Sequence, residues 1–297
     1  MSNPSASMQL SCASHSLDLT MPRVMGILNV TPDSFSDGGR YTHVDKALSQ
    51  AERMLKEGAA IIDVGGESTR PGAAPVPPAE ELDRVAPVVE RLVNELGALV
   101  SLDTSTPQVI TECAELGAGM VNDVRSLTRE GALEAAAATR MAVCVMHMKG
   151  EPQVMQNDPH YEGPVSTAVI DFLKSRVEAC EAVGIGRDRL VVDPGFGFGK
   201  NLAHNLELMN ELEQCQCLDL PILVGTSRKG MIGRVLADAS GVPRNIGESG
   251  EGRLYGGLAL TTMAVERGAR IIRTHDVAPT HDAICQTWAV MNRTLPA

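Results

Sequence analysis

The sequence lacks several features that mark other classes of protein. Aromatic residues make up only 3% of its 297 residues, and nowhere do about 18 uncharged apolar residues stand together, as a membrane-spanning helix would need. Lys and Arg number 26 against 37 Asp and Glu, a net charge of −11, so the excess of positive charge that nucleic-acid surfaces carry is missing. We therefore expect no membrane and no nucleic-acid partner.

The seven cysteines also lack a pattern. They form no CxxC pair and no Cys/His zinc spacing, and their number is odd, which argues against a disulfide framework and against structural zinc. The segment 1–20 has no basic start followed by an apolar run, as a secretory signal would have. These absences predict a cytoplasmic protein with free thiols.

What the chain does have is a globular balance, with 43% apolar and 21% charged residues, which excludes disordered, collagen-like and coiled-coil chains. Short apolar runs alternate with segments of helical spacing, which predicts a parallel sheet buried on both faces. The runs are VMGILN (24–29), AAIIDV (59–64), ALVSLD (98–103), GMVND (119–123), AVCVMH (142–147), RLVVD (189–193), PILVG (221–225) and RIIRTH (270–275). Eight such units favour a (β/α)8 barrel, a TIM barrel of the α/β class, over an open doubly wound sheet.

The barrel is predicted as one domain over residues 21–297, preceded by an N-terminal extension over 1–20. Ser105 or Thr106 before Pro107 is typical of a helix cap with proline at the first helical position. Glycines at 58, 117 and 268 are expected to end helices just before strands. The polar segment ASGVPRNIGESGEG, 239–252, is predicted as an insertion loop within a helical stretch.

Polar residues gather where the predicted strands end, the face at which barrel enzymes build their sites. Any single carboxylate there is often only a turn former, but the number of polar positions on one rim is hard to explain by turns alone. They are Asn29, Asp63, Asp103, Asn122, Asp123, His147, Asp193, the run 225–230, Arg273 and His275.

The residue types suggest a flat heterocycle and an anion. Asp103, Asn122 and Asp193 offer hydrogen-bond acceptors and one amide donor to a ring rich in N–H groups, and Met146 and Phe198 are placed to line its faces. At the end of the last strand, Arg273 and His275 suit a phosphate or pyrophosphate, with Asn29 as an oxygen ligand for Mg²⁺.

Two glycine-containing segments need separate treatment. GTSRKG (225–230) joins a strand to a helix, so Ser227 and Arg228 suit a carboxylate or phosphate, while Lys229 is either a hydrogen-bond donor or a Schiff-base nucleophile. GFGFGK (195–200) lacks the Walker spacing, and Asn201 follows its lysine. We do not expect a nucleoside triphosphate there.

These segments together resemble the dihydropteroate synthase family over nearly the whole chain. The resemblance rests on MGILNVTPDSFSDGG (25–39), DVGGESTRPGA (63–73), SLDTS (101–105), VNDV (121–124), MHMKG (146–150), DPGFGFGK (193–200), GTSRKG (225–230) and RTHDV (273–277). The segment 239–252 departs from it, being longer than the family leads us to expect.

The resemblance implies a transferase of folate biosynthesis. It would condense 6-hydroxymethyl-7,8-dihydropterin pyrophosphate with p-aminobenzoate to give 7,8-dihydropteroate and pyrophosphate, by a dissociative substitution at the pterin methylene carbon. It also implies Mg²⁺ as cofactor, sulfonamides as inhibitors and a homodimer.

The site residues that it implies fall into overlapping groups. The catalytic residues are Asp103, Lys229, Arg273 and Asn29; the pterin ligands are Asp103, Asn122, Met146, Asp193, Gly197, Phe198, Lys229 and Arg273; pyrophosphate is held by Asn29, Thr69, Arg70, Arg273 and His275; p-aminobenzoate is held by Pro32, Phe35, Thr69, Arg70, Pro71 and Ser227; and the metal ligand is Asn29. Asp33 and Arg70 would pair across the segments 31–40 and 65–78, which would exclude water.

Three other functions remain open at this point. A methyltetrahydrofolate-dependent methyltransferase would share the heterocycle site but would not need the NVTPDSFSD segment or a pyrophosphate site. A Schiff-base aldolase would use Lys229 as nucleophile, and a non-catalytic binding protein would not need every signature segment.

Overall fold

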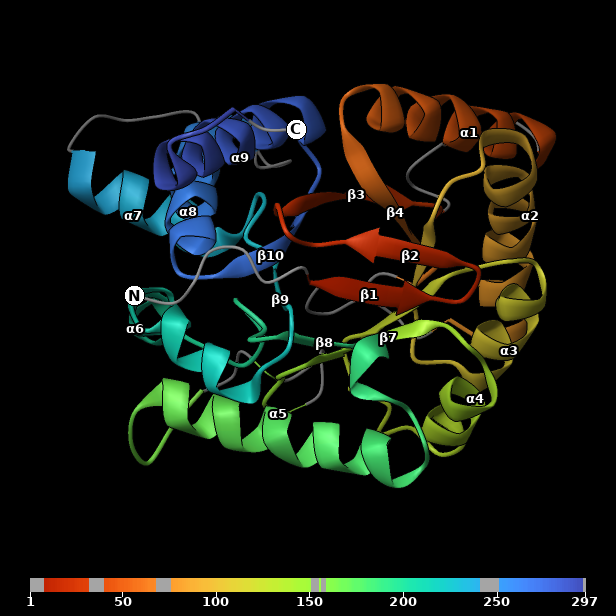
Figure 1. The fold of residues 1–297 in the computed structure, drawn as a ribbon, viewed down its shortest axis with the longest axis horizontal. Helices are drawn as coiled ribbons and strands as arrows, with labels where there is room; N and C mark the ends of the chain where they lie inside the picture. Colours follow the sequence, from red (N-terminus) through yellow and green to blue (C-terminus); the bar gives the residue numbers. More distant parts are fainter. Residues whose placement is uncertain are drawn as a thin grey trace.

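The protein is described here from a computed structural model that covers residues 8–31, 40–67, 76–150, 155, 159–240 and 251–295. Eight parallel strands within these ranges close into a barrel in the order β10-β3-β4-β5-β6-β7-β8-β9 (Figure 1). The strands are β3 (Arg23–Asn29), β4 (Ala59–Gly65), β5 (Val100–Asp103), β6 (Met120–Asp123), β7 (Ala142–Met146), β8 (Leu190–Asp193), β9 (Ile222–Val224) and β10 (Ala269–Thr274). The predicted (β/α)8 barrel is confirmed, strand for strand.

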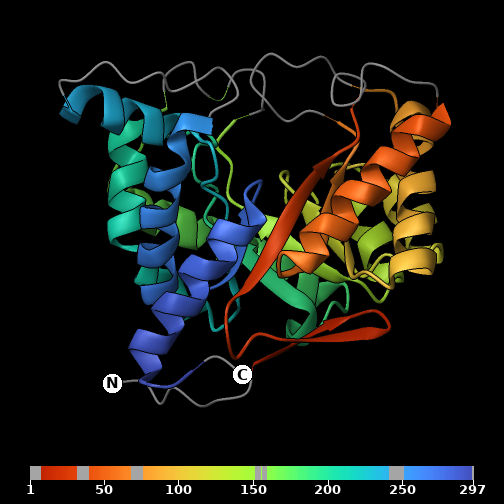
Figure 2. The ribbon, with the colours of Figure 1, turned by 90° about the horizontal axis from the view of Figure 1, so that it is seen from above.

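Helices connect the strands and form the outer layer of the barrel (Figures 1 and 2). They are α1 (Arg40–Lys56), α2 (Pro78–Leu96), α3 (Pro107–Glu115), α4 (Ala132–Ala138), α5 (Val165–Ala182), α6 (Leu202–Asn210), α7 (Gly230–Ser240), α8 (Leu254–Glu266) and α9 (Val277–Asn292), with short 3-10 turns η2 (Arg187–Arg189), η3 (Leu212–Leu218) and η4 (Glu251–Arg253). None of the helices in the described ranges is long and apolar enough to span a bilayer.

The helix boundaries follow the sequence signals, with one difference. Gly58, Gly117 and Gly268 each end a helix with φ near +100°, a conformation that costs glycine little. Helix α3 begins at Pro107 as predicted, but the Thr106 hydroxyl does not cap it and donates instead to buried Glu81, at 2.5 Å. Both edges of the predicted insertion are helical, in α7 and η4, while residues 241–250 lie outside the described residues.

Alternation along the strands sorts the apolar residues into two layers, because successive strand side chains point to opposite faces. One layer, which includes Ile62, Val100 and Val143, packs against the helices. The other fills the barrel interior, with Met25, Ile61, Met120, Val191, Leu223 and Ile271. Two residues further along the strands, on the same inward face, stand Asp63, Asn122, Asp193 and Arg273, so the barrel interior changes from apolar to polar toward the carboxyl ends of its strands.

The N-terminal extension forms a structure that the sequence did not reveal. Strands β1 (Gln9–Cys12) and β2 (His15–Asp18) pair as an antiparallel hairpin, which lies across one end of the barrel (Figure 2). Leu10, Cys12 and Leu19 are fully buried there against the interior apolar layer. The hairpin therefore closes the amino-terminal end, and the polar carboxyl-terminal end remains for a site.

Candidate active site

The candidate site lies at the carboxyl ends of the strands and is organised by one arginine. Arg273, on β10, donates from Nε to Asp63 Oδ2 and from Nη2 to Asp103 Oδ2, both at 2.6 Å. Asn122 also donates from Nδ2 to Asp63 Oδ2, at 3.2 Å. Four strands thus contribute to one hydrogen-bonded group, and the structure brings together three of the predicted pterin ligands.

Asp63 is the residue of this group that the predicted site omitted. Its side chain is completely buried, and its Oδ1 has no hydrogen-bond partner among the described residues. The sequence placed Asp63 on the polar rim, but the contact with Arg273, 210 positions away along the chain, follows only from barrel closure.

Burial controls the titration of these groups. Removal from water, assisted by neighbouring carboxylates and opposed by Arg273, raises the pKa of Asp103 to about 7. Burial likewise raises the pKa of Asp193, which Lys229 partly offsets. The pKa of Lys229 is lowered to about 8, again chiefly by burial. Ionised Asp103 and protonated Lys229 therefore coexist in a narrow range of pH near neutrality.

A second part of the site is built around Lys229, just before α7. The Lys229 ammonium donates to the carbonyl oxygen of Phe196 and lies 4.3 Å from the centre of the Phe198 ring, within cation–π range. Asp193 Oδ1 accepts from the Gly195 N–H at 2.7 Å. The predicted ligands Asp193 and Lys229 thus lie on either side of one stretch of chain, 195–199. Phe198 and Gly197 belong to this stretch, and a Cβ added to Gly197 would stand 3.2 Å from Lys229 Cδ.

The glycines of this stretch allow the chain to approach its neighbours closely. Gly195, Gly197 and Gly199 all have positive φ, at +70°, +79° and +63°, and a Cβ at Gly195 would stand 1.9 Å from the His147 carbonyl oxygen. The Lys200 ammonium is buried under the loop, on protein carbonyls and on His147. The glycines therefore serve close packing of this loop against its neighbours.

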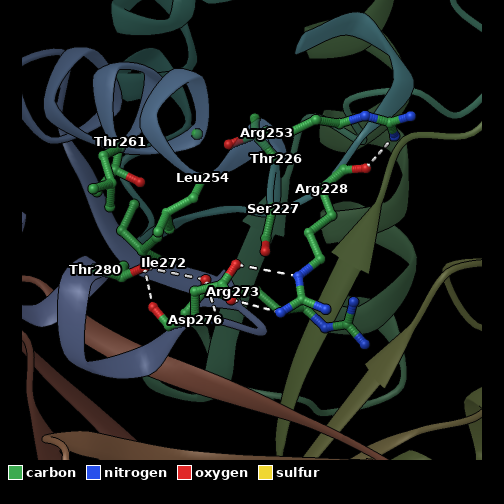
Figure 3. A pocket seen from close by; sticks show the side chains of 13 residues that line it. Thr226, Ser227, Arg228, Arg253, Leu254, Thr261, Ile272, Arg273, Asp276 and Thr280 are labelled. Carbon is green, nitrogen blue, oxygen red and sulfur yellow. Dashed lines mark hydrogen bonds and ion pairs between the residues drawn. The ribbon is translucent and has the colours of Figure 1, made fainter. Parts of the chain in front are cut away.

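The third part of the site joins the ends of β9 and β10. Ser227 Oγ lies 3.1 Å from His275 Nδ1 and accepts from the His275 N–H at 3.2 Å. Arg228, whose φ is +58°, pairs with both oxygens of Asp276, at 2.6 and 3.2 Å. Figure 3 shows Ser227, Arg228, Arg273 and Asp276 together beside a small cavity of about 10 Å³, room for one water. Ser227, Arg273 and His275, which the sequence predicts to bind anions, therefore lie near one another.

Two further predicted residues stand where strands end. Asn29 is the last residue of β3 and is half-buried, and Met146 ends β7 with 3% of its surface exposed. Five predicted residues, Pro32, Phe35, Thr69, Arg70 and Pro71, lie outside the described residues, as does Asp33. No cluster of three His, Cys, Asp or Glu side chains suited to a metal occurs in the described ranges.

Behind the site lies a polar network that no sequence signal indicated. Arg125 donates to Ser105 Oγ at 3.1 Å and lies 3.6 Å from Glu67, while Ser105 donates to Asp123. Asp123 also accepts the backbone N–H groups of Arg125 and Leu127, at 2.8 and 2.7 Å. Asp123, a rim residue without an assigned ligand role, thus stabilises the turn after β6, next to Asn122.

Comparisons with known proteins agree on one relationship. A family model described as pterin binding enzyme matches residues 25–275. The chain is 50% identical to a dihydropteroate synthase of Escherichia coli over 277 residues, 93% of this chain and 94% of the relative. A Yersinia pestis dihydropteroate synthase solved with a sulfonamide drug is 50% identical, with a TM-score of 0.87 over 96% of this chain and all of that one. A Xanthomonas albilineans dihydropteroate synthase solved with 4-aminobenzoic acid is 45% identical, with a TM-score of 0.86 over 98% of this chain and all of that one.

Proposed function

The chain belongs to the dihydropteroate synthase family of pterin-binding enzymes, transferases of folate biosynthesis, and we propose how its barrel mouth performs that reaction. The substrates are 6-hydroxymethyl-7,8-dihydropterin pyrophosphate and p-aminobenzoate, and the products are 7,8-dihydropteroate and pyrophosphate. The observation that carries the proposal is the convergence of Asp103, Asn122, Asp193 and Lys229 around Arg273.

The pterin edge and these side chains are complementary. A pterin presents several N–H donors along one edge and a carbonyl oxygen beside them. Asp103 and Asp193 supply acceptors, Asn122 supplies both an acceptor and a donor, and Lys229 supplies a donor. Arg273 reaches this group from β10. Because 22% of its side chain is exposed, it can lie against the pterin ring. Met146 and Phe198 complete the apolar surroundings.

The chemistry follows from the leaving group. Loss of pyrophosphate leaves a cation at the methylene carbon that is delocalised into the ring, so the site must stabilise the departing charge and exclude water. Arg273 and His275 are placed to hold the pyrophosphate oxygens. The aniline nitrogen of p-aminobenzoate is unprotonated near neutral pH and already nucleophilic. We therefore propose a dissociative substitution with no covalent protein intermediate.

The residues of the site are compatible with Mg²⁺ carried by the substrate. Mg²⁺ usually binds one or two protein oxygens together with substrate phosphates rather than an all-protein cage, which fits the lack of an acidic cluster among the described residues. Asn29, at the end of β3, would supply the protein oxygen. Bound there, the ion would neutralise charge on pyrophosphate.

We assign the second substrate, p-aminobenzoate, to the part of the site around Ser227. The Ser227 hydroxyl is proposed to donate to the carboxylate of p-aminobenzoate, at the amino terminus of α7, where such anions are favoured. The other residues proposed for it, Pro32, Phe35, Thr69, Arg70 and Pro71, lie outside the described residues; Thr69 and Arg70 are proposed for pyrophosphate as well. Sulfonamides carry the same aniline ring and are proposed to compete here.

We further propose a cytoplasmic homodimer. All seven cysteines are free thiols, which suits a reducing compartment. Large apolar side chains are exposed on α8 and α9, among them Tyr255 at 79% and Val290 at 69%, and a second copy of the chain would cover them.

Product formation tests the function directly. The protein is incubated with pterin pyrophosphate, p-aminobenzoate and Mg²⁺, and 7,8-dihydropteroate is detected by mass spectrometry, with and without chelator. No product, or methyl transfer from methyltetrahydrofolate instead, would contradict the proposal. Borohydride trapping of a substrate on Lys229 would support the alternative that the protein is an aldolase. Loss of turnover without Mg²⁺ would support the proposed requirement for the metal.

A further inference from the structure

Lys200 is a buried cation to which the proposed reaction gives no role. Only 2% of its surface is exposed. Its ammonium lies 2.8 Å from His147 Nδ1, 2.8 Å from the Gly195 carbonyl oxygen and 3.2 Å from the Phe198 carbonyl oxygen. A fourth acceptor, the His147 carbonyl oxygen, lies 3.4 Å away. These acceptors cover the three donors of an ammonium, so no donor is left for a ligand.

The partners of Lys200 join two loops that end at the candidate pterin site. His147 follows β7 directly, and its own N–H donates to the Asp193 carbonyl oxygen at 2.9 Å. Gly195 and Phe198 belong to the loop after β8. One ammonium therefore connects the end of β7 with the stretch 195–199.

That stretch carries the groups that place Lys229. The Phe196 carbonyl oxygen accepts from the Lys229 ammonium, the Phe198 ring lies beneath it at 4.3 Å, and Gly197 packs against its side chain. On the other side, the Gly195 N–H holds Asp193 Oδ1 at 2.7 Å. A shift of the loop would therefore move the donor Lys229 and the acceptor Asp193 together.

The position of Lys200 is costly, which calls for an explanation. Burial lowers the pKa of Lys200 well below its usual value of 10.5, opposed by the charge of Asp193. The His147 pKa is lowered to about 3 by burial and by Lys200, so the imidazole is neutral and its Nδ1 accepts from the ammonium. An apolar residue would avoid the burial of charge but would leave the carbonyl oxygens of Gly195 and Phe198 without this donor.

We propose that Lys200 is a positioning residue for the pterin end of the site, holding the stretch 195–199 against His147 so that Lys229 and Asp193 meet the same ligand edge. This inference rests on the proposed roles of Lys229 and Asp193 in pterin binding. Lys200 itself touches no substrate, so it acts through the loop alone.

The test compares Lys200→Met with the wild type. Calorimetry with 6-hydroxymethyl-7,8-dihydropterin pyrophosphate and Mg²⁺ gives Kd, and steady-state kinetics give KM for each substrate. We expect Kd and KM for the pterin to rise at least about tenfold, with KM for p-aminobenzoate at saturating pterin nearly unchanged. Lys174→Met is the matched control, because Lys174 lies on α5 with its side chain exposed.

A second pair of variants covers the case in which Lys200→Met does not fold. His147→Asn keeps an acceptor near the position of Nδ1, whereas His147→Leu has the same size without one. The proposal expects weaker pterin binding for His147→Leu and recovery in His147→Asn.

Three results would overturn the proposal. A folded Lys200→Met with a lowered Tm and unchanged pterin Kd would make the lysine purely structural. Equal pterin binding by both His147 variants would do the same. An equal loss in Lys174→Met would remove the link to the loop 195–199. Failure of the wild type to bind the pterin would instead refute the proposed function, so the two failures are distinguishable.

Discussion

Replacement of Asp63 by asparagine tests whether this buried carboxylate orients Arg273, the arginine that we propose to be catalytic. In the wild type, Asp63 Oδ2 accepts from both Arg273 Nε and Asn122 Nδ2, and Oδ1 has no partner among the described residues. An asparagine that keeps its oxygen toward these two donors must place its NH2 group where Oδ1 stood. The variant therefore loses the charge of a 2.6 Å hydrogen bond and buries an unpaired donor.

The size of the effect follows from these two losses. A charge-assisted hydrogen bond contributes about 1.5 to 3 kcal/mol, and an unsatisfied buried polar group costs about 1 to 3 kcal/mol. Because Arg273 keeps its contact with Asp103, we expect the lower part of the summed range, about 3 kcal/mol, or roughly a hundredfold. The loss should fall on kcat/KM for pterin pyrophosphate, since Arg273 is proposed to bind that substrate.

Steady-state kinetics at saturating p-aminobenzoate measure this loss, and calorimetric Tm values check folding. Asp45→Asn is the control, because Asp45 pairs with Arg91 on the surface with 64% of its side chain exposed, and such pairs contribute about 0 to 1 kcal/mol. A folded Asp63→Asn enzyme with kcat/KM within about threefold of the wild type would refute the reasoning.

Three other predictions concern the same site. Asp193→Asn should weaken pterin binding about a hundredfold, through loss of a buried charged acceptor; calorimetry that shows equal affinity in the folded variant would contradict this role. The pH profile of kcat/KM should be a narrow bell that rises as Asp103 ionises near pH 7 and falls as Lys229 loses its proton near pH 8. Lys229→Arg should remove the fall at alkaline pH, and an unchanged profile in this variant would disprove the role of Lys229 in it. Sulfonamides should compete with p-aminobenzoate, and Phe35→Leu or Pro71→Ser should raise the drug Ki about tenfold with a smaller change in the substrate KM; parallel changes in the two constants would exclude discrimination by these residues.

The strands, and the gathering of polar residues at their carboxyl ends, were predictable because local sequence determines them. Inward alternation places Asp103, Asn122, Asp193 and Arg273 at strand ends, and a closed barrel necessarily brings those ends to one rim. The residue types at the rim then indicate an N–H-rich ligand and an anion. Physical reasoning from composition and spacing reached this far, and the family resemblance added the reaction.

The features that escaped prediction depend on tertiary packing. The hairpin β1/β2 consists of two four-residue strands, and its turn has Ala13 at φ +54° where a glycine or asparagine would have given a signal. Asp63 carried the right residue type but gained its role only from Arg273, across the barrel. The spacing around Lys200 already argued against a nucleoside triphosphate site, but its contacts with His147 and the loop after β8 became visible only in the fold.

The polar layer of the barrel is organised for a ligand at the expense of its own stability. Asp63, Asp103 and Asp193 face the nearby cations Arg273 and Lys229, with Lys200 also acting on Asp193, and burial raises the pKa of both Asp103 and Asp193. Without a ligand these carboxylates stay poorly compensated, because the N–H donors around them are fewer than their acceptor sites. A pterin edge would supply the missing donors in a dry environment, where each hydrogen bond is stronger than in water. The same arrangement that weakens the free barrel thus favours binding, and the apolar layer beneath it, closed by the N-terminal hairpin, provides the stability that this arrangement requires.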